Sequence, residues 1–169
     1  MSFAGLLFET DTTAIESITM CRSTSYGIIA RLNAMWHSVL PEAPAGMRVG
    51  FVFYHDGGVP IACAMWGRPS ARLEDQGTTL ELTRLAHSPV VPRNFGSWAL
   101  ARMRGWIREH MPEIVRLISY QDATIHHGTI YKADNWRQVY DQEKTHSWSN
   151  RVGRLGNERQ HKIKWEREP

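Results

Sequence analysis

The segment TLELTRLAHSPVVPRNFGSWALARMRGWIREHMPEIVRLISYQD, residues 79–122, decides the fold. Its first part, residues 79–86, alternates leucine with polar side chains as a half-buried strand does, with a candidate bulge at residues 83–85. Residues 93–111 then predict a long helix, and residues 113–120 predict a second strand. One face of that helix is apolar and carries Phe95, Ala99, Met103, Trp106 and Ile107. A strand–helix–strand crossover of this kind belongs to an α+β or mixed α/β design.

The residues before the crossover predict helix and hairpin. Residues 12–38 have the three-to-four apolar spacing of a helix, in two pieces. Residues 49–54 and 59–66 are β-runs on either side of an Asp-Gly pair, which is a strong hairpin signal. We therefore expect an antiparallel start to the sheet.

The residues after the crossover predict one short helix and further strands. Residues 127–133 favour a helix, and residues 161–166 alternate apolar and charged side chains as a last strand does. Residues 138–140 and 147–148 are candidates for edge strands. Since the sequence has no repeat or linker, we expect one domain over residues 1–169, with a central mixed sheet flanked by helices.

The composition excludes several classes of protein. The chain has 169 residues, 42% of them hydrophobic and 22% charged, which is ordinary for a soluble globular domain. No apolar run approaches the ~18 residues of a membrane helix, and the N-terminus lacks a basic region, so we expect no secretory signal. Cys21 and Cys63 are isolated, with neither metal spacing nor the density of a disulfide framework. We expect buried free thiols in a reducing cytoplasm.

The excess positive charge lies at the C-terminal end. Residues 1–144 hold 14 basic and 14 acidic side chains, whereas residues 145–169 hold six basic and three acidic, which accounts for the net +3. A basic segment beside aromatic residues suits a polyanion such as nucleic acid. A solvated tail, or an edge strand protected by lysine, explains the same charge equally well.

The first candidate site is the start of the long helix. Helix N-termini present N–H groups without acceptors and a partial positive charge, and they bind phosphate. Arg93 would add charge and Ser97 a hydroxyl, while Gly96 would let a ligand approach the backbone. The alternative is that Asn94 simply caps the helix.

The second candidate site lies at the carboxyl end of the second crossover strand. Ser119, Asp122 and Tyr131 should gather there, in the cleft where two strands diverge. A positioned tyrosine can protonate a departing thiolate, because its pKa lies above that of the thiol. The alternative is that Tyr131 packs with Ile130 to seal the short helix onto the sheet.

The third candidate site is on the first crossover strand. Glu81 in a cleft could accept a proton from an attacking amine, directly or through water. The alternative is a structural ion pair with a surface arginine. His126, His127 and Asp122 could also be interpreted as metal ligands, but adjacent histidines on a helix point about 100° apart and seldom chelate one ion. We therefore expect no metal site.

Four strings in order resemble one known family. ELTRLA (81–86), PRNFGS (92–97), SYQD (119–122) and HHGTIYKADNW (126–136) resemble the phage Mom-type DNA-modification family, which is GNAT-like in fold. WHSVLP (36–41) also fits. The chain departs from the general GNAT coenzyme loop at Trp98, where a small residue is usual, and from the Mom-type pattern at Gln121, where alanine is usual.

The resemblance implies roles for particular residues. The acetyl-CoA (coenzyme A) site would comprise Leu85, Ala86, His87, Arg93, Asn94, Gly96, Ser97 and Tyr131. The catalytic residues would be Tyr131, Asp122, Glu81, Arg84 and Ser97. The substrate side would comprise His37, His126, His127 and Ser119, and DNA phosphates would contact Arg151, Arg154, Lys162 and Lys164.

The leading hypothesis is an acyl-CoA-dependent transferase that modifies a nucleobase in phage DNA, in the host bacterial cytoplasm, as protection from restriction. The target base would be flipped or single-stranded. Two alternatives remain open: an acetyltransferase acting on a small-molecule or protein amine, and a non-catalytic GNAT-like binding protein. The sequence leaves the oligomeric state unknown, with a homodimer as one option.

Overall fold

The computed structural model describes residues 14–37, 39–56, 58–144 and 160–169. Within these residues, seven strands form one sheet in the order β1-β2-β3-β4-β5-β7-β6. In chain order, the elements are η1 (Ile15–Ser17), β1 (Ile18–Ser23), α1 (Tyr26–Trp36), β2 (Met47–His55), β3 (Val59–Gly67), β4 (Thr79–His87), α2 (Phe95–His110), β5 (Arg116–Asp122), α3 (Thr129–Ala133), β6 (Arg137–Lys144) and β7 (Gln160–Arg167).

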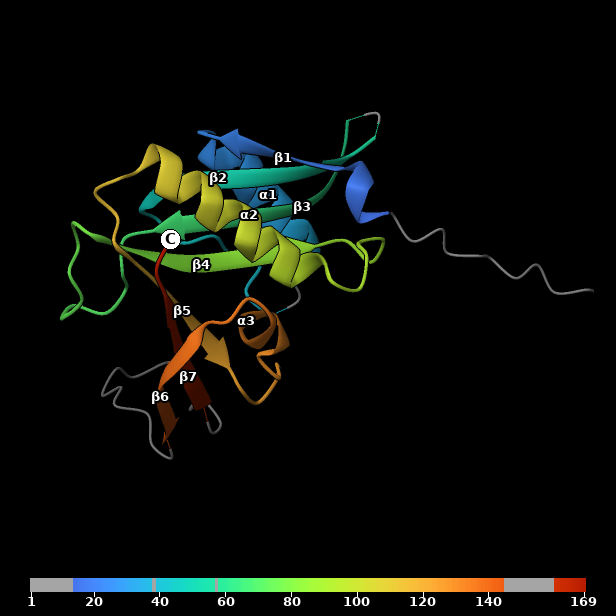
Figure 1. Cartoon of the computed structure of the whole chain (residues 1–169). Helices are drawn as coiled ribbons and strands as arrows, with labels where there is room; N and C mark the ends of the chain where they lie inside the picture. The colour runs from blue at the N-terminus through green and yellow to red at the C-terminus, as the bar shows by residue number, and fades with distance from the viewer. Residues whose placement is uncertain (1–13, 38, 57, 145–159) are drawn as a thin grey trace, which may run out of the picture.

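The sheet is mixed because one pair of strands is parallel. β4 pairs with β5 in parallel from Thr79–Arg116 to Leu82–Ser119, and all other neighbours pair antiparallel. Beyond Leu82 and Ser119 the two strands part: β4 stays with β3 and β5 stays with β7. Figure 1 shows β5, β7 and β6 turned away from β1–β4. This confirms the predicted mixed α+β fold and its crossover.

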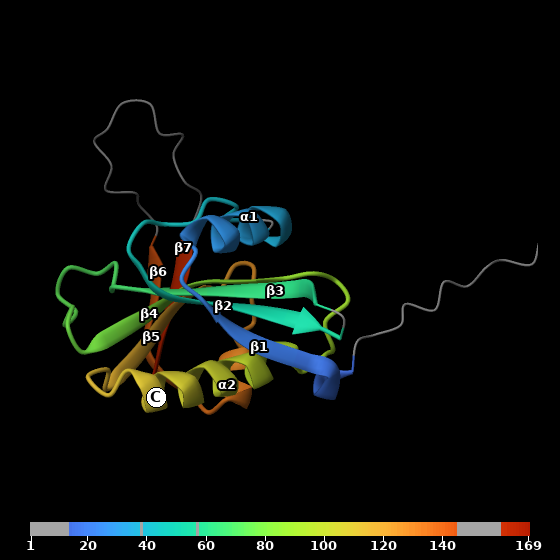
Figure 2. The same cartoon turned by 90° about the horizontal axis from the view of Figure 1, so that it is seen from above.

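Helices cover both faces of the sheet. Figure 2 shows α1 on one side of β1–β4 and α2 on the other. The buried side chains of α2 match most of the predicted apolar face and are Phe95, Ala99, Leu100, Met103 and Ile107. Each of these side chains except Ala99 contributes roughly 1.5–3 kcal/mol when fully buried. None of the helices described is long and apolar enough to cross a membrane.

The prediction of two helical pieces over residues 12–38 is wrong for the first piece. Residues 18–23 form β1, which pairs antiparallel with β2 from Ile18–His55 to Ser23–Gly50. The helix begins only after Ser25, whose side chain accepts a hydrogen bond from Ile28 N at 3.3 Å. Pairing with a distant strand therefore outweighed a local pattern that suits either structure.

Three smaller expectations also need correction. α3 begins at Thr129 and not at residue 127, because Gly128 precedes it with a φ of 69°. β7 is an interior strand between β5 and β6, so its lysines do not protect an edge. Both cysteines are free, but Cys21 is exposed; Cys63 is buried, and burial raises the pKa of its thiol to about 12. The predicted strand at residues 147–148 lies outside the described residues.

Candidate active site

The point where β4 and β5 part carries a pair of buried hydroxyls. Ser119 Oγ lies 2.8 Å from the hydroxyl of Tyr131, which comes from α3, and 3.3 Å from the main-chain oxygen of Leu82. Only Ser119 can donate to that carbonyl, so the consistent arrangement has Tyr131 donating to Ser119 Oγ. The structure thus brings two predicted site residues together where the two strands part.

The ring of Tyr131 is fixed by aromatic contacts. It stacks on Trp165 of β7, with centroids 5.3 Å apart and planes inclined by 13°, and meets Trp136 edge-on at 5.6 Å. Burial raises the pKa of the Tyr131 hydroxyl, and the hydrogen bond with Ser119 partly opposes that shift. The hydroxyl therefore holds its proton at neutral pH, so it can act as a general acid and not as a general base.

The first turn of α2 has free N–H groups. Asn94 occupies the N-cap position, but its side chain makes no capping bond; its main-chain oxygen accepts from Ser97 Oγ and from Trp98 N, both at 3.2 Å. The N–H groups of Gly96 and Ser97 have no acceptor among the residues that the structure describes. With exposed Arg93 beside them, these N–H groups have the chemistry that an anion requires, and anion binding here stays a prediction.

Gly96 lacks a side chain because Ile130 packs against it, and not because a ligand approaches the backbone there, as the sequence suggested. A methyl group added at Gly96 would lie 2.4 Å from Ile130 Cγ2. The glycine therefore lets α3 approach the start of α2, and so helps to place Tyr131. The side of Gly96 where a Cβ would stand faces Ile130, not a ligand.

Trp98 stands at the position where the general coenzyme loop has a small residue. Its ring packs at 6.1 Å from both Phe53 and Phe95, with the guanidinium of Arg102 at 5.4 Å. These contacts direct the ring to the aromatic core beneath α2. The indole is thereby occupied with packing.

We call the place after Leu82 and Ser119, where β4 and β5 part, the split. The edge of β4 beyond the split has no partner in β5. The ladder with β5 ends at Leu82, while β4 continues along β3 to His87. The register with β3 shifts between Leu82 and Arg84, so the predicted bulge is present and centres on Thr83. The main chain around Leu85, Ala86 and His87 is therefore available to pair with an extended ligand.

A group of basic side chains lies on the α1 side of the split. His37, at the end of α1, accepts a hydrogen bond from Leu40 N through Nδ1. Burial lowers its pKa, and the charges of Arg84 and His126 lower it further, so these three residues lie near one another. Arg84 is held by two bonds to the main-chain oxygen of Glu42, at 3.2 and 2.8 Å. The predicted substrate residues His37 and His126 thus lie within electrostatic range of one another, with Arg84 also in range of His37.

The two candidate bases have different surroundings. Glu81 is buried, and its Oε2 accepts from Ser70 N at 2.6 Å and from Ser70 Oγ at 2.8 Å. This replaces the arginine pair considered above. Asp122 uses Oδ1 to accept from Thr124 N at 3.0 Å and from Thr124 Oγ1, which stabilises the turn after β5. Glu81 keeps Oε1 free of any partner within the described chain.

The expected phosphate contact at Lys164 does not suit its position. Its amino group is buried and paired with Glu74 and with Glu166, the latter at 3.0 Å. Burial lowers the pKa of Lys164, but the two carboxylates outweigh burial and raise it overall. Lys162 is exposed, as is His127. Arg151 and Arg154 lie outside the described residues.

Several supporting residues were not anticipated. Gln121 bridges the loop before α3 to β7, because its Nε2 donates to the His126 main-chain oxygen and its Oε1 accepts from Trp165 Nε1 at 2.7 Å. Asp134 accepts two bonds from Arg104, both at 2.7 Å, and ties α3 to α2. In the part of the chain that is described, no cluster of three His, Cys, Asp or Glu side chains could hold a metal ion.

Solved structures share this fold at low sequence identity. The spermidine N-acetyltransferase from Vibrio cholerae, in complex with CoA and spermine, aligns with a TM-score of 0.61 and 10% identity, over 90% of this chain and 96% of that one. The IAA acetyltransferase from Bacillus cereus aligns with a TM-score of 0.61 and 14% identity, over 90% and 100%. No curated protein matches the chain in sequence.

A family model matches most of the chain. The Mom protein family matches residues 58–168, which include β3, the β4–α2–β5 crossover, Tyr131 and β7. The chain belongs to the Mom protein family and has the fold of the GNAT acetyltransferases.

Proposed function

We propose that the protein is an acyl-CoA-dependent N-acyltransferase-like enzyme that modifies a nucleobase in phage DNA and so protects that DNA from restriction. The observation that carries the proposal is the contact of the Tyr131 hydroxyl with Ser119 Oγ, at 2.8 Å, where β4 and β5 part. The Mom family match supports the DNA target, and the fold supports acyl transfer.

The residues on the α2 side of the split fit a coenzyme A thioester. The free N–H groups of Gly96 and Ser97, with Arg93, would hold its pyrophosphate. The unpaired edge of β4 around Leu85 would pair with the amides of its pantetheine arm. The bound coenzyme would supply an activated acyl carbonyl and a sulfur leaving group.

The chain's own groups would then move two protons. Glu81 or Asp122 would take the proton released by the attacking amino group, directly or through water, because each keeps one carboxylate oxygen without a partner among the described residues. Tyr131 would give its proton to the departing sulfur. A main-chain N–H at the Thr83 bulge would stabilise charge on the carbonyl oxygen.

The α1 side of the split suits a nucleobase as the acceptor of the acyl group, because it offers hydrogen-bond donors to the edge of a base. His37, Arg84 and His126 place basic groups there, and the lowered pKa of His37 keeps its imidazole neutral near pH 7. With Nδ1 accepting from Leu40 N, His37 carries its proton on Nε2 and can donate to a base edge. A flipped base would present its amino group to this side.

A small-molecule or protein amine is the second candidate, because the spermidine enzyme shares the fold. The guanidinium of Arg84 disfavours a polycation such as spermidine. Purified protein given labelled acetyl-CoA and, in parallel, duplex DNA, single-stranded DNA, spermidine and a peptide amine tests the choice. The proposal requires label in a DNA base. Label found only in spermidine or the peptide would mean that the acceptor is an amine and not DNA. If calorimetry detected no coenzyme binding, the non-catalytic binding protein would be the remaining alternative.

A further inference from the structure

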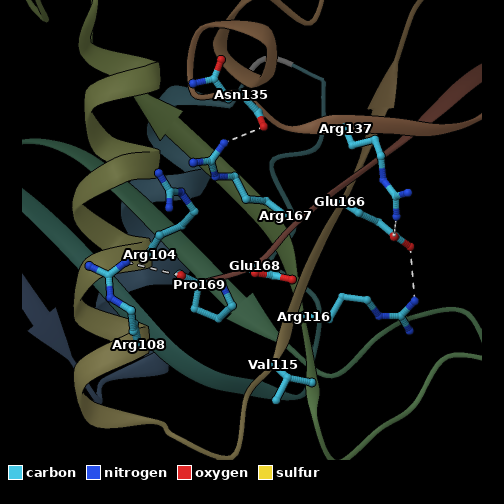
Figure 3. A pocket seen from close by; sticks show the side chains of 10 residues that line it. All are labelled: Arg104, Arg108, Val115, Arg116, Asn135, Arg137, Glu166, Arg167, Glu168 and Pro169. Atoms are coloured by element: carbon cyan, nitrogen blue, oxygen red, sulfur yellow. Dashed lines mark hydrogen bonds and ion pairs between the residues drawn. The ribbon is translucent and has the colours of Figure 1, made fainter.

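A hollow of about 820 Å³ lies at the far end of α2 from the candidate active site. Five arginines from four elements and their flanks line it: Arg104, Arg108, Arg116, Arg137 and Arg167. Figure 3 shows Arg104, Arg108 and Arg167 next to α2, and Arg116 and Arg137 beside Glu166 across the strand ribbons. We call this surface the arginine hollow.

The arginine hollow is separate from the proposed coenzyme site. Arg108 follows Gly96 by twelve residues on α2, which corresponds to ~18 Å along a helix. Arg116 opens β5, whereas Ser119 marks the end of its ladder with β4. The chemistry proposed above therefore uses none of the residues of the hollow.

Two of the arginines are already neutralised. Arg104 makes its two bonds with Asp134, and the pair is almost fully buried. Arg116 pairs with Glu74 and, at 3.2 Å, with Glu166. These ion pairs fix the walls of the hollow.

The other three arginines are less completely neutralised, although Glu168 also lines the hollow. Arg108 and Arg167 contact only main-chain oxygens among the described residues, those of Pro169 and Asn135. Arg137 lies 3.4 Å from Glu166, a carboxylate that Arg116 and Lys164 also use, and its side chain is 79% exposed. Arg108 could simply offset the dipole at the end of α2, but that explanation does not extend to the other two.

The chemistry of the lining favours a phosphodiester backbone. Guanidinium groups bind phosphate oxygens through paired N–H donors. None of the lining residues is aromatic, so a nucleotide base would find no stacking partner there. A DNA duplex presents one negative charge per ~1.7 Å of its axis and can reach several separated arginines at once.

We propose that the arginine hollow docks the phosphate backbone of duplex DNA, as an auxiliary contact outside the active site. The choice of DNA as the polyanion rests on the proposed function. Binding here would be independent of sequence and sensitive to salt, because it reads only phosphates.

Fluorescence anisotropy with a labelled duplex, from 0.05 to 0.3 M salt, tests this. The test variant is Arg108→Gln with Arg137→Gln, two exposed side chains whose loss spares the buried pairs. The control is Arg31→Gln with Arg72→Gln, which removes the same charge from exposed positions elsewhere. Each lost phosphate contact should weaken binding roughly five-fold near 0.15 M salt and lower the salt slope by about 0.9.

The expected result is about a 25-fold weaker complex for the test variant, a slope lower by about 1.8, and little change for the control. Equal losses in both variants, no loss in the test variant, or no binding by the wild type would overturn the proposal. Acetyl-CoA calorimetry on the same samples separates the two proposals: intact docking without coenzyme binding would leave the hollow standing and refute acyl transfer.

Discussion

The hydroxyls of Ser119 and Tyr131 lie 2.8 Å apart at the last residue pair that joins β4 to β5. One group comes from a strand and the other from α3, so the contact ties a candidate acid to the point where the sheet opens. Because the Tyr131 ring is also stacked on Trp165, its hydroxyl has a defined position before any ligand arrives.

Replacing Tyr131 with phenylalanine should remove the proton donor and keep the stacked ring. We expect turnover to fall about 10²- to 10⁴-fold, as for loss of a general acid, with coenzyme affinity nearly unchanged. Single-turnover kinetics and calorimetry measure the two effects. Tyr54→Phe, in β2 away from the split, is the matched control; unchanged turnover in Tyr131→Phe across all pH values would remove the acid role.

Ser119→Ala should change the pH dependence of the reaction. The Ser119 hydrogen bond lowers the pKa of Tyr131, so its loss should raise that pKa and move the alkaline limb of the rate profile to higher pH. The buried tyrosine hydroxyl would also lose its partner, which should cost about 1–3 kcal/mol of unfolding free energy. An alkaline limb that does not move would mean that the limb belongs to another group.

Gly96→Ala should destabilise the contact between α2 and α3. The added methyl group would lie 2.4 Å from Ile130 Cγ2. Overpacking of this kind lowers the free energy of unfolding by roughly 1–3 kcal/mol. Ile130→Ala removes that carbon, so the double variant should recover part of the loss. Denaturant unfolding of the four proteins gives the coupling energy; additive effects would show that the clash relaxes elsewhere.

The ion pairs of Glu74 should make stability depend on acid pH. Burial raises the pKa of Glu74, but Lys164 and Arg116 outweigh burial and lower it overall. A lowered carboxyl pKa contributes stability above the unfolded value, about 4.3, and loses it as pH falls through the folded value. Denaturant unfolding between pH 3 and 7 should therefore show a steeper acid loss in the wild type than in Lys164→Met. Equal acid slopes would mean that Lys164 does not hold Glu74 ionised.

The elements with local signals could be predicted from the sequence. The α2 stripe, the hairpin of β2 and β3, and the crossover from β4 to β5 each depend on spacing within a short window. The sequence also predicted that Ser119 and Tyr131 would lie near each other, because both were expected near the carboxyl end of the second crossover strand.

The remaining features depend on partners far away in the chain. β1 was predicted as helix because its partner β2 lies far along the chain, 37 residues on in the Ile18–His55 pair. The alternation of apolar and charged residues in β7 indicates that the strand has two different faces. Only the structure shows that Lys164 on one of them forms an ion pair with Glu74. Likewise, the sequence suggests a small residue at Gly96 without revealing that Ile130 is the reason.

The most direct test of the account is mass spectrometry of nucleosides from DNA made in cells with the wild-type protein, without it, and with Tyr131→Phe. We expect a nucleoside of increased mass with the wild type, none without the protein, and at most a trace with Tyr131→Phe. Identical nucleosides in all three samples, or full modification with Tyr131→Phe, would contradict it.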